Sequence, residues 1–122
     1  MTEPVRVLVV EDQPDTAEVL ALILERNGYQ VAVAHDGLSA LALVDESPPH
    51  CLLLDVKMPG LNGAELARRV RERHGNDIVL IAISGGNTDD AQVVDTFARV
   101  DHYLHKPIDA AMLTKVLPPL DG

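Results

Sequence analysis

The sequence predicts an α/β domain built on a doubly wound parallel sheet of five strands. Five short apolar runs alternate along the chain with segments whose apolar residues recur at helical spacing. Two of the runs, residues 51–54 and 78–83, contain no polar residue, which is typical of strands buried on both faces of a parallel sheet. Alternating strands and helices imply right-handed crossover connections, which place helices on both faces of the sheet.

The first strand and helix are predicted over residues 5–10 and from Pro14 onward. Residues 5–10 are rich in valine, and Pro14 suits the first turn of a helix because its missing N–H would have no partner there. Gly28 is well placed to end this helix, whose apolar positions are Ala17, Leu20, Ala21 and Leu24. A second, shorter strand then runs from residue 31 to about residue 35.

Capping and turn-forming residues divide the rest of the chain. Asp36 is suited to cap a second helix, which the pair Pro48-Pro49 ends. Gly75 and Asn76 form a turn between the third helix and the fourth strand. We expect the remaining elements in this order: a strand at Cys51–Asp55, a helix at 62–74, a strand at 78–83, a helix at 88–98, a strand at 102–104 and a helix at 108–117.

This order of elements indicates the flavodoxin-like (βα)5 fold, with strand order 2-1-3-4-5. In such a sheet, ligands bind at the carboxyl ends of the strands, beside the point between strands 1 and 3 where the strand order reverses. No internal repeat or linker interrupts the pattern. We therefore expect a single domain over residues 1–122, with its core in 5–117 and no output domain.

The composition narrows the class of protein. The 122 residues are 47% hydrophobic and 24% charged, which is the balance of an ordinary globular domain. The net charge of −9 argues against direct binding to nucleic acid or to an anionic membrane, because both attract cationic surfaces. The apolar runs are far shorter than the ~20 residues that span a bilayer. Since there is no secretory signal and only one cysteine, Cys51, we expect a cytoplasmic protein.

Reactive side chains follow four of the predicted strands. Glu11 and Asp12 come after the first strand, and Asp55 ends the third. Ser84 follows the fourth strand, and Lys106 follows the fifth. Taken singly, each residue has an ordinary explanation as a cap, a turn residue or a surface charge. A parallel sheet brings all of them to one edge, however, and this coincidence favours a functional site.

The residue types at this edge favour metal-assisted phosphoryl transfer. Three crowded carboxylates repel one another unless a cation joins them, and a few hard oxygen ligands suit Mg²⁺, with Mn²⁺ as a substitute. Lys106 and such a cation would stabilise phosphoryl oxygens, while Ser84 would donate a hydrogen bond to one of them. Asp55 has no serine or cysteine nucleophile beside it, so we expect this carboxylate to attack phosphorus itself.

Four segments carry a resemblance to the receiver domains of two-component response regulators, such as the chemotaxis response regulator. These segments are VLVVED at 7–12, LLLDVKMPGLNG at 52–63, IAISG at 81–85 and YLHKP at 103–107. The resemblance extends from residue 5 to about 117, and the run DHYLHKPID is similar to receivers attached to hybrid histidine kinases. It implies a phosphoacceptor in a two-component or phosphorelay system. A histidine kinase or a histidine phosphotransfer protein would then be the donor, and a further protein the downstream target.

The resemblance also implies roles for the residues at the edge of the sheet. Asp55 is similar to the phosphorylated aspartate, and Lys106 to the lysine that contacts the phosphoryl group. Glu11 and Asp12 match the acidic pair that holds Mg²⁺. Asp55 and the backbone carbonyl of Lys57 match its further ligands.

By the same resemblance, Ser84 and Tyr103 form a switch. They match the hydroxyl and the aromatic ring that shift together on phosphorylation and repack the surface of helix 4, strand 5 and helix 5. Two departures from the family pattern stand near them. Arg99-Val100 occupy the place where Gly-Ala is frequent, and Gly85 stands where alanine is common. Neither departure removes a reactive side chain.

Two groups of charged residues have no assigned chemistry. One is expected to lie on the solvated face of the third helix and consists of Arg68, Arg69, Arg71 and Arg73. The other is a candidate charged face between two copies of the chain and consists of Arg99, Asp101 and Lys115.

Three alternatives stay open from the sequence. The first is a receiver-like docking module that is never phosphorylated. The second is a phosphatase of the haloacid dehalogenase type, although such enzymes usually carry a second aspartate two residues after the first, where this chain has Lys57. The third is a flavin- or nucleotide-binding module, which would need a Gly- or Thr/Ser-rich phosphate loop where Glu11-Asp12 repel phosphate. We therefore expect no turnover of an external substrate.

Overall fold

The computed structural model describes residues 4–56, 63–85, 99–106 and 108–118. The five strands are β1 (Arg6–Val10), β2 (Gln30–Ala34), β3 (Cys51–Asp55), β4 (Val79–Ser84) and β5 (His102–His105). The described helices are α1 (Pro14–Arg26), α2 (Gly37–Glu46), α3 (Gly63–His74) and α5 (Ala110–Val116). The helix expected at 88–98 lies outside the described residues, as does Lys57.

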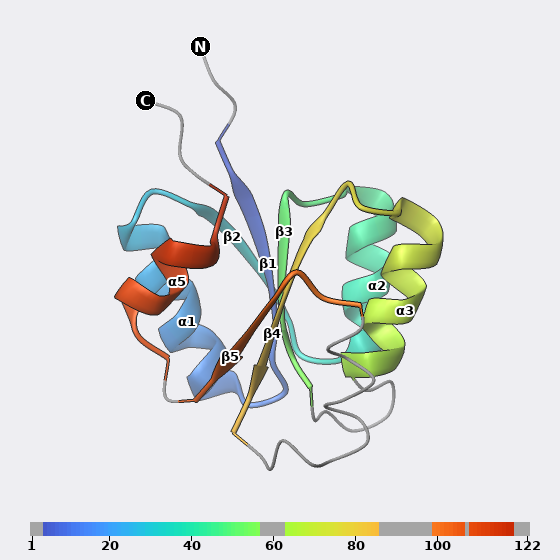
Figure 1. The fold of residues 1–122 in the computed structure, drawn as a ribbon. Helices are drawn as coiled ribbons and strands as arrows, with labels where there is room; N and C mark the ends of the chain where they lie inside the picture. Colours follow the sequence, from blue (N-terminus) through green and yellow to red (C-terminus); the bar gives the residue numbers. More distant parts are fainter. Residues whose placement is uncertain (1–3, 57–62, 86–98, 107, 119–122) are drawn as a thin grey trace.

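All five strands run parallel in the order β2-β1-β3-β4-β5, which confirms the predicted topology. Figure 1 shows α1 and α5 on one face of the sheet and α2 and α3 on the other. Because the strands are parallel, their carboxyl ends meet at one edge, at the bottom of Figure 1, which we call the carboxyl edge. None of the helices described is long and apolar enough to cross a membrane.

Residues of the central strands alternate between the two faces of the sheet. In β1, Val7 and Val9 pack toward α1 and α5, whereas Leu8 and Val10 pack toward α2 and α3. All five residues of β3 are buried. Burial on both faces explains why β3 is apolar up to its last residue, Asp55, and why that carboxylate stands out in the sequence.

Capping residues set the helix boundaries. Asp36 caps α2, as predicted, by accepting a hydrogen bond from the Ser39 N–H at 2.7 Å. Asp109 caps α5 in the same way, accepting from the Met112 N–H at 2.8 Å. The last helix therefore begins at Ala110 and not at residue 108, as expected from the sequence. The strand boundaries differ from the expected ones by one residue at most.

The arginine cluster of α3 is not uniformly solvated, contrary to expectation. The side chains of Arg68, Arg69 and Arg73 are between 36% and 48% exposed, but that of Arg71 is only 18% exposed. Arg71 donates to Asp101 at 2.8 Å, so Asp101, which belongs to the candidate charged face between copies, also makes a contact within the chain. Sequence periodicity places a residue on a helix but does not show what lies beside it.

Helix α3 starts directly against the end of β3. Gly63 donates its N–H to Val56 O at 3.0 Å. A Cβ at this position would lie 2.6 Å from Asp55 O and 2.7 Å from Val56 Cα. Both neighbours are backbone atoms, which cannot rotate away as a side chain can. Glycine is thus required for the helix to approach this close to Asp55.

Gly63→Ala is expected to destabilise the fold by about 2 kcal/mol or more, because the new methyl group must displace the backbone of β3. Urea denaturation measures this free energy of unfolding. Gly85→Ala is the matched control, since its Cβ would meet Lys106 Cδ at 3.5 Å, an ordinary contact. We expect the control to change stability by less than about 0.5 kcal/mol. Equal losses in the two variants would contradict the close packing at Gly63.

Candidate functional site

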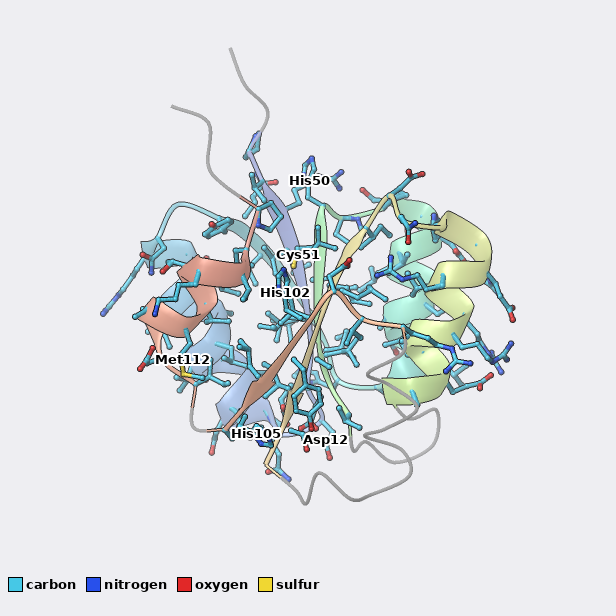
Figure 2. The ribbon with its side chains drawn as sticks, viewed as in Figure 1. Asp12, His50, Cys51, His102, His105 and Met112 are labelled. Carbon is cyan, nitrogen blue, oxygen red and sulfur yellow. The ribbon has the colours of Figure 1, made fainter. Side chains whose placement is uncertain are left out.

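Four strands deliver polar side chains to the carboxyl edge. Glu11 follows β1, Asp55 ends β3, Ser84 ends β4 and Lys106 follows β5. The labelled side chain of Asp12 marks this edge in Figure 2. The structure thus brings the predicted residues to one edge of the sheet, and the parallel pairing of the strands is the reason.

Glu11, Asp12 and Asp55 form a compact cluster of carboxylates. Each offers one oxygen atom, and the three oxygens lie within 4.8 Å of one another. Glu11 is 1% exposed and Asp55 is 7% exposed, while Asp12 is half-buried. Three oxygen donors at this spacing, one of them reached by solvent, fit a hard divalent cation that keeps several water ligands.

Burial and a neighbouring carboxylate change the acidity of Glu11. Burial, followed by a hydrogen bond to Asp55 and the charge of Asp55, raises the pKa of Glu11 to about 7. A hydrogen bond from the Gln13 N–H to Glu11 Oε1, at 3.2 Å, and the charge of Lys106 act in the opposite direction. Without a metal, Glu11 therefore holds its proton throughout the acidic range, which relieves repulsion within the cluster.

Lys106 supplies the cationic side of the site. Its Nζ donates to Asp55 Oδ2 at 3.0 Å and lies 3.5 Å from Glu11 Oε2. Partial burial lowers the pKa of Lys106, but the hydrogen bond and charge of Asp55, together with the charge of Glu11, outweigh burial and raise it. The backbone positions this lysine, because its N–H donates to Ser84 O at 3.0 Å and continues the pairing of β4 with β5.

Ser84 and Tyr103 lie on neighbouring strands. Ser84 is 1% exposed and follows Ile83, which pairs with Asp55 in the register of the sheet. Tyr103 is half-buried and packs against the core on the α2 and α3 face. Its ring meets that of His105 edge to face, with the centroids 5.2 Å apart. The predicted switch residues therefore stand one and two strands away from Asp55.

Two residues of this site have no role in the sequence-based prediction. Gln13 gives a backbone N–H to Glu11, and Gly63 packs against Asp55 O. A backbone donor leaves no signal in the residue type, so Gln13 could not have been identified. Gly63 does leave a signal in the sequence, because a glycine at the start of a helix indicates close approach of another backbone.

The raised pKa of Glu11 predicts how metal-free stability depends on pH. An acid whose pKa rises on folding destabilises the folded state once the pH exceeds its unfolded value of 4.5, and this cost is complete above about 7. We expect the free energy of unfolding, measured in EDTA, to fall by roughly 2 kcal/mol from about pH 5 to about pH 8. Glu11→Gln should remove most of this fall, because an amide does not titrate.

Glu25→Gln is the control for this experiment, because Glu25 is exposed on α1. It should leave both the stability and its pH dependence close to those of the parent, within about 0.5 kcal/mol. If Glu11→Gln kept the full pH dependence of the parent, the assignment of that dependence to Glu11 would be wrong.

The sequence is similar to those of proteins whose family is known. A sequence model of the response regulator receiver domain matches residues 7–118. The response regulator MprA of Mycobacterium bovis (strain BCG / Pasteur 1173P2) is 39% identical over 103 residues, which cover 84% of this chain and 44% of that protein. MprA of Mycobacterium ulcerans (strain Agy99) is also 39% identical over 103 residues. The chain thus spans less than half the length of these curated relatives.

Solved receiver structures share the fold. The CheY-like receiver domain from Methylobacillus flagellatus gives a TM-score of 0.84 at 27% identity, over 93% of this chain and 96% of that one. The CheY-like receiver domain protein from Methanospirillum hungatei JF-1 gives a TM-score of 0.85 at 25% identity, over 93% and 90%. With the strand order and the polar residues of the carboxyl edge, these matches establish that the chain belongs to the response regulator receiver domain family of two-component signalling.

Proposed function

We propose that Asp55 accepts a phosphoryl group, and that the chain is the phosphoacceptor receiver of a two-component or phosphorelay system. The observation that carries the proposal is the contact of Asp55 Oδ2 with Lys106 Nζ at 3.0 Å, inside a cluster of two further carboxylates. Asp55 is suited to act as a nucleophile, because the groups that would stabilise the developing charge are close to it. One is the Lys106 ammonium, and the other is a metal ion that Asp55 would share with the two further carboxylates.

The proposed reaction transfers the phosphoryl group from a phosphohistidine of the donor protein. A carboxylate oxygen of Asp55 forms a bond to phosphorus while the phosphorus–nitrogen bond breaks. The bonding electron pair goes to the imidazole nitrogen, which takes up a proton. The Lys106 ammonium, already beside Asp55, then partly neutralises the oxygens of the new acyl phosphate.

The carboxylate cluster fits Mg²⁺ by the chemistry of its donor set. Receiver domains bind this ion at an acidic pocket, and we propose that Glu11, Asp12 and Asp55 hold it here, with Mn²⁺ as a substitute. The backbone carbonyl of Lys57 is the further ligand in this proposal. The bound cation would neutralise charge on the carboxylates and on the phosphoryl oxygens.

Phosphorylation is also the signal in this proposal. A phosphoryl group adds close to two negative charges and three strong acceptor oxygens at the carboxyl edge. We expect Ser84 to donate its O–H to this group, and Tyr103 to move inward on the neighbouring strand. The surface of the predicted fourth helix, β5 and α5 would then repack. A local change of charge would in this way favour one of two arrangements of that surface.

A hollow beside Lys106 offers a place for the phosphodonor. Its lining includes Asp15, Thr16 and Val19 of α1 together with Ile108, around a volume of about 600 Å³. Val19 is 57% exposed, so its side chain is open to contact from a docked protein. We place a cytoplasmic histidine kinase or histidine phosphotransfer protein here, and a downstream protein on the switched surface. No direct contact with nucleic acid or membrane is expected.

Receiver domains are signalling modules, and we propose that this chain turns over no external substrate. A phosphatase of the haloacid dehalogenase type usually has an aspartate at the position of Lys57. A nucleotide-binding module would need a phosphate-binding loop at the position of Glu11-Asp12. The docking module that is never phosphorylated differs from the proposed function only in whether Asp55 reacts, so uptake of a phosphoryl group separates the two.

Asp55→Asn is expected to lower the uptake of a labelled phosphoryl group, from a phosphorylated donor or from acetyl phosphate, by at least about 100-fold, because an amide is a poor nucleophile. The control is Asp109→Asn at the N-cap of α5, where asparagine caps as well as aspartate. The control should keep the parent's rate. Uptake by Asp55→Asn at that rate would overturn the proposal, and no uptake by any of the three proteins would favour the docking module.

Magnesium binding is expected to weaken in acid. The cation must displace the proton of Glu11, whose pKa lies at about 7, so the affinity should fall about tenfold from pH 8 to pH 6. Isothermal titration with MgCl₂ measures this affinity. Glu25→Gln should follow the parent, while Glu11→Gln should bind weakly at both pH values. An affinity that does not change over this range would refute a magnesium site that includes Glu11.

A further inference from the structure

Strand β5 carries Lys106 to the site, yet it is the shortest of the five described strands. It is an outer strand of the described sheet, and its four residues pair with β4 alone, from Ile81 opposite His102 to Ser84 opposite His105. A short edge strand is weakly held in register, and a slip of one residue turns every side chain to the opposite face. Such a slip would take Lys106 away from its place at the carboxyl edge.

Asp101 makes two hydrogen bonds with Leu80, which connect the start of β5 to β4. Its N–H donates to Leu80 O at 2.8 Å, and its Oδ2 accepts from the Leu80 N–H, also at 2.8 Å. The carboxylate thereby takes the place of a backbone carbonyl at the start of the strand. Both bonds can form together in only one alignment of β5 on β4.

Arg71 of α3 holds this carboxylate in place. Its Nη2 donates to Asp101 Oδ2 and its Nε to Arg99 O, both at 2.8 Å, so one planar group binds the chain at two points before β5. Its Nη1 donates to Gly75 O and Ile78 O, both at 2.9 Å, in the turn that leads into β4. Burial raises the pKa of Asp101, but the backbone and guanidinium hydrogen bonds that it accepts outweigh burial and lower it.

We propose that Arg71 and Asp101 are positioning residues, which set the register of β5 and thereby hold Lys106 at Asp55. Lys106 lies five positions after Asp101, roughly 16 Å along an extended chain, so Arg71 acts on the site through the strand. The expected effect on the rate of phosphorylation rests on the proposed function, whereas the effect on the register of β5 does not. The carboxylate cluster stands on β1 and β3, which pair with each other, so we expect it to keep its place without this anchor.

Arg71→Gln tests the proposal, with Arg73→Gln as the matched control on the same helix. Arg73 pairs with Asp45 of α2. With both variants folded, Arg71→Gln should lower the rate of phosphorylation by acetyl phosphate at least about fivefold without lowering Mg²⁺ affinity. Arg73→Gln should change neither quantity. Arg71→Lys keeps the charge but not the planar fork, and should restore part of the rate.

A double variant shows whether Arg71 acts through Lys106. In a Lys106→Ala background, Arg71→Gln should cause no further loss of rate, because the group that it positions is gone. A full fivefold loss in that background would overturn the inference. So would a loss of Mg²⁺ affinity equal to the loss of rate, since that would indicate general damage to the fold.

Hydrogen exchange tests the pairing of β5 with β4 independently of phosphorylation. The Lys106 N–H, bonded to Ser84 O, should exchange at least about tenfold faster in Arg71→Gln, while amides of β1 and β3 keep the parent's rates. Unchanged exchange at Lys106 would overturn the inference. Faster exchange there, in a protein whose parent takes no phosphoryl group, would support the register and refute the proposed function instead.

Discussion

The balance of charge at the carboxyl edge governs the rest of the site. Three carboxylate oxygens lie within 4.8 Å of one another, and the raised pKa of Glu11 reflects the cost of bringing them together in a buried place. Lys106 offsets part of this cost through its contacts with Asp55 and Glu11. The negative charge that remains destabilises the metal-free fold, and in the proposed function the same charge attracts the divalent cation. Stability and function are opposed here, as is common at binding sites.

The fold divides the site between buried and partly exposed strands. Glu11 and Asp55 stand at the ends of β1 and β3, whose residues are almost all buried. Tyr103 and Lys106 belong to β5 and its end, at the partly exposed edge of the sheet. The carboxylates that we propose bind a cation thus lie on the best-packed elements. Tyr103, which we propose moves on phosphorylation, lies on an element whose packing is less extensive and easier to change.

Much of this arrangement could be predicted from the sequence, because it follows from local patterns. Uninterrupted apolar runs identify the buried strands, and parallel topology then brings Glu11, Asp55 and Lys106 to one edge. The contacts of Arg71 could not be predicted, because its acceptors are mostly backbone carbonyls that only the folded chain brings together. Helix α5 starts two residues later than the sequence analysis expects, because Asp109 caps it by accepting a hydrogen bond from the Met112 N–H.

Locating the phosphoryl group on the chain tests directly whether Asp55 is the phosphoacceptor. The protein is incubated with acetyl phosphate and Mg²⁺, the acyl phosphate is trapped by borohydride reduction, and the modified residue is identified by mass spectrometry of its peptides. We expect modification at Asp55 and at no other carboxylate, and its loss when the metal is removed. Modification of Asp12 or of Glu11 in place of Asp55 would contradict the proposed function, as would a fully unmodified chain under these conditions.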